Sequence, residues 1–243
     1  MKLEVNNIKK SFGGVHAVDD VALSFPEGKI SGIIGPNGSG KTTLMNLISG
    51  ITSIDSGTMA IGEHTHLRAI KSSDIRSYGI TRTFQTVCVF EQMTVLDNVL
   101  VVLTQRNVLK SIFEKSSNDY IEQAERALKM VNLWEKRNAL ASTLSYGQRK
   151  LLEVARVVSI DAEIYIFDEP FAGLFKEMVM VVSDILKELR SKGKTVILID
   201  HNMHLMRELS DILFVLDAGR VLAEGDPDEV LSMAIIKEAY LGE

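Results

Sequence analysis

The clearest chemical signal in this sequence is a glycine-rich segment, residues 35–42, which reads Gly-Pro-Asn-Gly-Ser-Gly-Lys-Thr. Glycines allow successive backbone N–H groups to turn inward around phosphate oxygens, because no Cβ stands in the way. The pattern predicts that the Lys41 ammonium reaches the β- and γ-phosphates of a nucleotide and that the Thr42 hydroxyl ligates Mg²⁺. A ligand-free glycine turn is the alternative, and the strand and helix predicted on either side disfavour it. The nucleotide-binding residues expected in this segment are Gly35, Pro36, Asn37, Gly38, Ser39, Gly40, Lys41, Thr42 and Thr43.

Two acidic residues follow an apolar segment in the last third of the chain. Residues 164–167, Ile-Tyr-Ile-Phe, predict a buried strand, and Asp168 and Glu169 come directly after it. Parallel α/β sheets bind ligands at the carboxyl ends of their strands. Asp168 is therefore expected to support Mg²⁺, and Glu169 to act as a general base that polarises an attacking water. On its own the pair is equally typical of a solvent-exposed turn, so the assignment depends on the phosphate loop.

A histidine and a glutamine complete the predicted catalytic set. His201 follows a predicted strand, residues 195–199, and an imidazole there can hydrogen-bond the γ-phosphate and align water and base. A lone histidine after a strand is more often structural. Here, however, three predicted strands place Lys41, the two acids and His201 at the same edge of the sheet, where the carboxyl ends of the strands lie. The amide of Gln85 can ligate Mg²⁺ or the attacking water, although a single glutamine is uninformative by itself. The expected catalytic residues are Lys41, Glu169 and His201, and the expected metal ligands are Thr42, Gln85 and Asp168.

Strands and helices alternate along the chain, which predicts a mostly parallel sheet with right-handed crossovers. The expected strands cover residues 3–8, 15–25, 30–34, 164–167, 195–199, 212–216 and 221–223, the last two as a hairpin. Helices are expected over residues 41–49 and 177–190, and helical periodicity continues over 95–158 with a polar interruption near 115–119. One face of this region is expected to be apolar through Ile121, Ala124, Leu128 and Val131.

These elements predict one α/β nucleotide-binding core formed by both ends of the chain. The core is expected at about residues 1–84 and 160–243, with a helical subdomain inserted at about 85–159.

The overall composition argues against several classes of protein. With a net charge of −5 and no block of Lys or Arg, the chain lacks the basic patch typical of nucleic-acid-binding proteins. No apolar run approaches the roughly 20 residues that cross a bilayer, and residues 1–10 are too polar for a signal peptide, so a cytoplasmic location is expected. Cys88 is expected to be a buried structural thiol, and His64 and His66 to be solvated residues of a polar loop without a metal.

Residues 144–148, Leu-Ser-Tyr-Gly-Gln, distinguish among proteins with a phosphate loop. Ser145 is a good N-cap, and Gly147 exposes backbone amides at the start of the following helix, which makes a second anion site. The segment resembles the signature peptide of ATP-binding cassette (ABC) proteins, which kinases and small GTPases lack. An ordinary capped helix is the alternative, and the order of the other motifs disfavours it. The resemblance implies that Ser145, Gly147 and Gln148 complete the ATP site of an opposing subunit.

The resemblance to ABC proteins covers essentially the whole chain, residues 1–243, as a single ABC ATPase domain. It implies an α/β fold of the P-loop NTPase class, with a mostly parallel sheet core, an antiparallel β subdomain and an inserted α-helical subdomain. ATP and Mg²⁺ are the implied ligands. The implied assembly is a homodimer, or a heterodimer with a homologue, that closes head to tail on two MgATP molecules. Its helical insertions would pass the motion to integral membrane permease subunits, which would hold the chain at the inner face of the cell membrane.

Within this family the chain looks closest to the ATPase subunits of branched-chain amino acid importers, on segments 12–14, 17–21, 81–85, 93–99, 223–225 and 239–243. This likeness implies uptake of branched-chain or other small amino acids. It also places Phe12 where an aromatic ring stacks on adenine, and a core phenylalanine is an equally good interpretation of that residue. A lipid-exporting ABC ATPase is a close alternative. A soluble ABC ATPase acting on DNA or ribosomes is disfavoured, because those usually contain a long coiled coil or two cassettes.

Four positions depart from the family pattern. Tyr146 stands where the general signature has Gly, residues 200–202 read Asp-His-Asn where this subgroup has Glu-His-Asp, and Phe12 replaces the usual Tyr. Phe175 stands where the loop after the catalytic Glu normally carries Asp or Asn. In this family that loop crosses the dimer interface. An aromatic side chain at residue 175 therefore argues against normal coupling between the subunits. It favours a rival hypothesis, an ATP-sensing module with slow or absent hydrolysis.

Overall fold

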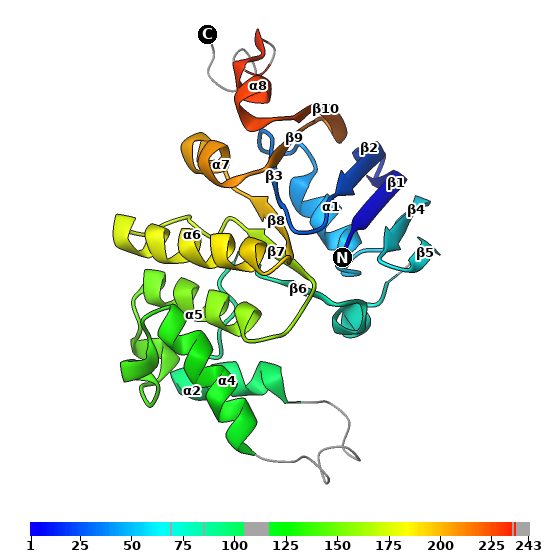
Figure 1. Cartoon of the computed structure of the whole chain (residues 1–243). Helices are drawn as coiled ribbons and strands as arrows, with labels where there is room; N and C mark the ends of the chain where they lie inside the picture. Colours follow the sequence, from blue (N-terminus) through cyan, green and yellow to red (C-terminus); the bar gives the residue numbers. More distant parts are fainter. Residues whose placement is uncertain (69, 85, 105–116, 235, 237–243) are drawn as a thin grey trace. The chain divides into compact units, whose positions relative to one another are not determined.

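The computed structural model describes the chain except for residues 69, 85, 105–116, 235 and 237–243 (Figure 1). The chain divides into two compact units. The core unit comprises residues 1–82, 162–169 and 186–243, and the helical unit comprises residues 83–161 and 170–185. That the two units act as a single ABC ATPase domain stays a prediction.

A six-stranded sheet forms the centre of the core unit, in the order β10-β9-β3-β8-β7-β6. Its strands are β3 (Ile30–Ile34), β6 (Ile80–Arg82), β7 (Ile164–Asp168), β8 (Thr195–Ile199), β9 (Ile212–Asp217) and β10 (Arg220–Gly225). All pairs are parallel except the β9–β10 hairpin. Every residue of β3, β7 and β8 is buried, which explains their apolar sequences, since a parallel sheet is covered on both faces. The predicted mostly parallel sheet is confirmed.

A second sheet of the core unit is antiparallel and has four strands in the order β2-β1-β4-β5. Its strands are β1 (Leu3–Phe12), β2 (Val15–Phe25), β4 (Ser56–Ile61) and β5 (His64–Leu67). The prediction that His64 and His66 lie in a loop is wrong, because both belong to β5, an exposed strand that pairs with β4 at Ile61. Backbone pairing at a sheet edge tolerates polar side chains on the open face, so the polar sequence concealed the strand.

Helix α1 (Lys41–Ile48) shares one hydrophobic core with both sheets of the core unit. Leu44, Leu47 and Ile48 are buried on one face of the helix, as the spacing of apolar residues predicts. In the same core the rings of Phe25 and Phe214 pack edge to face, with 5.5 Å between centroids and 70° between planes. The remaining helices of this unit are the 3₁₀ helix η1 (Ser72–Tyr78), α7 (Met203–Leu209) and α8 (Pro227–Ser232).

The helical unit is built around three mutually packed helices, which are α2 (Val95–Leu103), α4 (Ser117–Met130) and α5 (Tyr146–Val158). The 3₁₀ turns η2 (Trp134–Lys136) and η3 (Ala141–Thr143) lead from α4 to α5, and α6 (Lys176–Ser191) begins in this unit and ends in the core unit. In the described part of the chain, no helix has both the length and the apolar character needed to cross a bilayer.

The apolar residues expected on one face of the helical segment are mostly buried: Ala124, Leu128 and Val131 are covered, whereas Ile121 is 39% exposed. Two other expectations for the helical unit are wrong. Of the interruption expected near 115–119, residues 115 and 116 lie outside the described residues, and residues 117–119 form the first turn of α4, where an acidic side chain such as Asp119 is favourable next to a helix N-terminus. Cys88 is exposed and not buried. Its neighbours along the chain form an irregular segment without a regular apolar face, so hydrophobicity alone did not predict its environment.

Candidate active site

The phosphate-loop segment connects the end of β3 to the start of α1 in the core unit. Gly38 and Gly40 have positive φ angles of 83° and 99°, which favour glycine. A Cβ at Gly40 would lie 2.3 Å from the carbonyl oxygen of Ala17, whereas one at Gly38 would meet nothing within 4 Å. Gly40 is also the N-cap of α1, with no side-chain cap and no acidic residue in the first turn. The loop therefore presents uncapped amides with the positive end of a helix dipole, which suits a phosphate group.

Lys41 lies inside this loop and is only 7% exposed. Its Nζ donates to the carbonyl oxygens of Gly35 at 2.6 Å and Pro36 at 2.9 Å. Burial lowers the pKa of Lys41, and the nearby charges of Glu169 and Asp168 oppose that shift. The ammonium is thus held between the loop carbonyls and the two acids. Of the two threonines that follow, Thr42 is exposed and Thr43 is half-buried in the first turn of α1.

Asp168 is the last residue of β7 and is 1% exposed. Its Oδ2 accepts a hydrogen bond from Nη2 of Arg82 at 2.8 Å. In the sequence Arg82 belongs to one of the segments that resemble the importer ATPases, 81–85, and nothing in that segment predicts its contact with Asp168. A lone arginine in the segment Ile-Thr-Arg-Thr-Phe, residues 80–84, gives no local signal of this contact.

Glu169 and His201 meet at the carboxyl ends of β7 and β8. Nε2 of His201 lies 2.9 Å from Oε1 of Glu169. The backbone of Glu169 has a positive φ of 49°, in the left-handed region that non-glycine residues rarely adopt, and its N–H donates to the oxygen of Ile199 at 2.8 Å. Such strain persists only where the surroundings impose it, and it often marks functional sites. The structure brings these two side chains together, and their catalytic roles stay predictions.

Phe12, at the end of β1, is 50% exposed, with the Lys10 ammonium 5.4 Å from its ring centroid. The alternative of a core phenylalanine is therefore wrong. A half-exposed ring is available for stacking, and contact with adenine stays a prediction. Gln85 lies outside the described residues.

The helix start predicted at Ser145 is confirmed within the helical unit. Ser145 caps α5 by accepting from the Gln148 backbone N–H at 3.3 Å, and Oε1 of Gln148 accepts from the Ser145 N–H at 3.2 Å. This capping box uses the Gln148 side chain for the helix itself. A Cβ at Gly147 would lie 2.7 Å from Sδ of Met178, so a larger residue would displace that side chain. A contact of this helix start with nucleotide stays a prediction.

Two aromatic departures from the family pattern are exposed in the helical unit. Phe175 is 75% exposed and Tyr146 is 49% exposed. A Cβ at Gly173 would lie 2.8 Å from Cε1 of Tyr146, so the tyrosine ring packs closely over this glycine.

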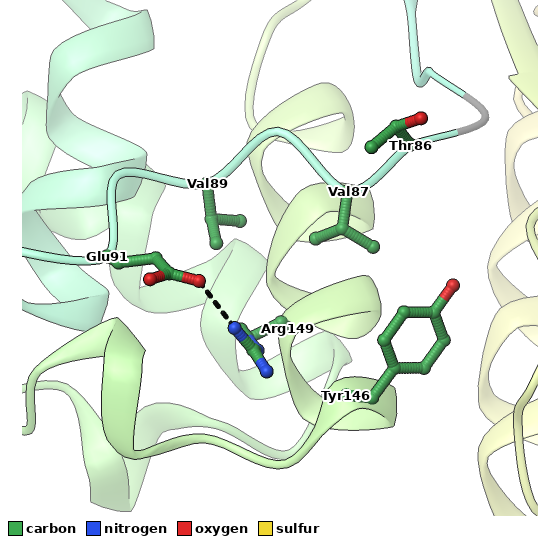
Figure 2. Close-up of a pocket in the computed structure, with 6 residues that line it drawn as sticks. All are labelled: Thr86, Val87, Val89, Glu91, Tyr146 and Arg149. Carbon is green, nitrogen blue, oxygen red and sulfur yellow. Dashed lines mark hydrogen bonds and ion pairs between the residues drawn. The ribbon is translucent and has the colours of Figure 1, made fainter.

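A cavity of about 340 Å³ opens in the helical unit beside the first turns of α5 (Figure 2). Its lining residues are Thr86, Val87, Val89, Glu91, Tyr146 and Arg149. Nη1 of Arg149 donates to Oε1 of Glu91 at 2.5 Å, and Figure 2 shows this pair on one side of the cavity and the Tyr146 ring on the other. The cavity thus combines apolar and aromatic side chains with one ion pair.

The core unit therefore contains an uncapped glycine loop before a helix, a buried lysine, a buried acid at a strand end and a glutamate paired with a histidine. This arrangement defines the class of phosphate-loop nucleoside triphosphatases. The family model described as "ABC transporter" matches residues 18–172. The chain belongs to the ABC transporter family, as an ATP-binding subunit that hydrolyses ATP to power transport.

Relatives and solved structures agree with this assignment. The chain is 36% identical to the high-affinity branched-chain amino acid transport ATP-binding protein LivG of Salmonella typhimurium, over 99% of this chain and 98% of that protein. It is 35% identical to BraF of Pseudomonas aeruginosa, which has the same description, over 99% and 98% of the two chains. An ATP-binding cassette of an ABC transporter, solved in its ADP conformation, matches with a TM-score of 0.85 and 33% identity over 100% of both chains.

Proposed function

We propose that this chain hydrolyses MgATP to drive uptake of branched-chain or other small amino acids through permease subunits. The substrate class is supported by full-length similarity to proteins named for branched-chain amino acid transport. The hydrolytic chemistry is supported above all by the Glu169–His201 pair, whose side chains lie 2.9 Å apart next to Asp168. A half-buried carboxylate that is oriented by a histidine just after a strand suits a general base for water.

Each predicted site residue takes one part of the chemical work in this proposal. Lys41 exchanges its loop carbonyls for the β- and γ-phosphate oxygens, and Phe12 stacks on the adenine. Thr42 and Asp168, with Gln85, would hold Mg²⁺, which supplies positive charge next to the phosphates. Glu169 polarises the attacking water, and His201 keeps Glu169 oriented and donates toward the γ-phosphate.

The active form we infer is a dimer, with this chain or a homologue as the second ATPase subunit. The phosphate loop of one copy faces the Ser145 and Gly147 helix start of the other, and Gln148 stabilises that helix start. The capping box supports this proposal, because it fixes the backbone N–H groups of the first turn of α5. An anion bound there would gain from the helix dipole.

Mixing two inactive variants tests the dimer. Lys41→Met removes the phosphate-loop charge, and Ser145→Arg blocks the signature helix start, so each variant alone should release phosphate at about 1% or less of the parent rate. A mixture should recover activity, because a mixed dimer contains one intact pair of loop and helix start. For the unmutated protein, phosphate release is measured at several protein concentrations. The rate divided by the protein concentration should rise as the concentration rises, because only the dimer is active. No recovery on mixing, or full activity of Ser145→Arg alone, would contradict the shared site.

We infer that the cavity of Figure 2 receives a segment of a permease subunit, which would hold this chain at the inner face of the membrane. Its valines and tyrosine offer apolar contact, and the Glu91–Arg149 pair offers charge for orientation. The cavity lies in the helical unit, whereas the hydrolytic residues lie in the core unit. Binding to the permease and hydrolysis are therefore expected to respond to different mutations.

Reversing one charge of this pair should release the permease. Glu91→Arg places two arginines together, and we expect co-purification with the membrane subunits to fall about tenfold or more. The ATPase rate of the free chain should stay within about twofold of the parent. Swapping both charges, Glu91→Arg with Arg149→Glu, keeps the ion pair and is the matched control for local folding. Normal co-purification of the Glu91→Arg chain would show that the permease binds elsewhere.

A further inference from the structure

The Arg82 side chain joins two elements of the candidate site and is only 3% exposed. Arg82 is the last residue of β6, the edge strand next to β7 (Figure 1). Its Nη2 donates to Oδ2 of Asp168 at 2.8 Å. Its Nη1 donates to Oδ1 of Asn46 at 2.8 Å and to Oγ of Ser49 at 2.9 Å. Asn46 lies in α1 and Ser49 is the C-cap of that helix, so one guanidinium bonds both the phosphate-loop helix and the end of β7.

These contacts require the geometry of a guanidinium. Its two terminal nitrogens are fixed in one plane and point to separate partners, whereas a lysine ammonium is a single point charge on a flexible stem. Burying a charge is costly, and an apolar side chain of similar volume would fill the space without that cost. The choice of arginine is therefore better explained by what it does to its partners than by packing.

The partners of Arg82 belong to elements that carry both halves of the proposed Mg²⁺ site. Lys41 and Thr42 begin α1, and Asp168 ends β7. A displacement of about 1 Å between such groups is enough to cost about a hundredfold in rate. A rigid bridge between α1 and β7 would keep this distance constant.

We propose that Arg82 is a positioning residue, which holds the Asp168 carboxylate in register with the phosphate-loop helix and offsets part of its negative charge. The proposal rests on the proposed role of Asp168 toward Mg²⁺. Arg82 is also the last residue of the core unit before the chain enters the helical unit. The hydrogen bond from Arg82 to Asp168 therefore also fixes the point at which the chain leaves the core unit.

Arg82→Gln tests both parts of the proposal. Without the guanidinium, the carboxylate loses its fixed orientation, and kcat at saturating MgATP should fall at least about tenfold. The carboxylate also loses a neighbouring positive charge, so the Mg²⁺ concentration for half-maximal binding in the presence of saturating ADP should fall at least about threefold. Calorimetric titration of Mg²⁺ measures this midpoint without turnover. A general loosening of the fold would instead weaken Mg²⁺ binding and raise the Mg²⁺ midpoint. The proposal is overturned if the Mg²⁺ midpoint does not fall, or if kcat stays within about twofold of the parent value.

Arg82→Lys separates geometry from charge and carries the test if Arg82→Gln does not fold. The charge remains, so the Mg²⁺ midpoint should stay within about twofold, while kcat should fall at least about threefold because one ammonium cannot hold both elements. A kcat equal to that of the parent overturns the proposal. Arg190→Gln is the matched control, since Arg190 pairs with Asp211 at 3.2 Å in the same unit, and neither quantity should change more than about twofold.

Asp168→Asn, measured in parallel, distinguishes the failure of this proposal from the failure of the proposed function. If Asp168→Asn retains the parent kcat and Mg²⁺ midpoint, the proposed metal role of Asp168 fails, and the proposal for Arg82 fails with it. If Asp168→Asn loses both while Arg82→Gln behaves as the parent does, only the proposal for Arg82 fails.

Discussion

Glu169→Gln is expected to lower the rate of phosphate release by about 10²–10⁴-fold, while MgATP binding stays within a few-fold of the parent. Gln has the shape of Glu but cannot accept a proton from water. The contact with Nε2 of His201 at 2.9 Å can persist, because the imidazole can serve as donor or acceptor through its tautomers. The variant also keeps the backbone at this position, where φ is 49°, under the same strain as before. Bound ATP should therefore remain intact.

A long-lived ATP-bound dimer is the second expected property of the Glu169→Gln chain. Size-exclusion chromatography with MgATP should show a dimer that ADP does not produce, because in the proposed dimer the γ-phosphate would bridge the two copies. Glu163→Gln is the matched control. Glu163 precedes β7 at its other end and pairs with Lys194 at 2.8 Å, so its loss should leave turnover within about twofold. Unchanged turnover of Glu169→Gln would defeat the assignment of the base.

Lys41→Met is expected to lower kcat/KM for ATP by about 10³-fold or more. In the proposed site the ammonium would supply the fixed positive charge next to the β- and γ-phosphates, where negative charge builds up in the transition state. Met has a similar length but no charge, so the affinity for MgATP should also weaken by about 10- to 100-fold, as expected for loss of charge-assisted hydrogen bonds. Phosphate release and calorimetric titration with ATP measure the two effects.

The control for this variant is Lys29→Met. Lys29 lies just before β3, at the end opposite the phosphate loop, and its ammonium is 3.6 Å from Asp211 with the side chain 54% exposed. An exposed ion pair of this kind contributes little, so melting temperature and turnover should match the parent. An equal loss of activity in both variants would indicate a general effect of removing lysines. It would refute a specific role of Lys41.

Some expectations from the sequence were wrong because long-range packing decides them. Exposure of Cys88 depends on which neighbours cover it, and a pattern along one segment does not contain that information. For His64 and His66, strand pairing with β4 overrode a polar sequence typical of a loop. In each case the local pattern was compatible with two environments.

The sequence by itself determined the elements whose signals are local. Continuous apolar runs predicted the buried strands β3, β7 and β8, because a parallel sheet buries both faces of such strands. Glycines at residues with positive φ specified the phosphate loop, and Ser145 with Gln148 specified the start of α5 by a capping box. The family and its chemistry followed from the order of these motifs, since each motif specifies its own backbone geometry.

Only the tertiary structure decided how the site residues contact one another. Glu169 and His201 are 32 positions apart, and Arg82 bonds Asn46 and Asp168 at separations of 36 and 86 positions. Such contacts depend on the strand order β8-β7-β6 and on where α1 packs, and the chain does not encode these as a local pattern. The sequence therefore does not predict the hydrogen bonds that Arg82 makes to Asn46 and Asp168.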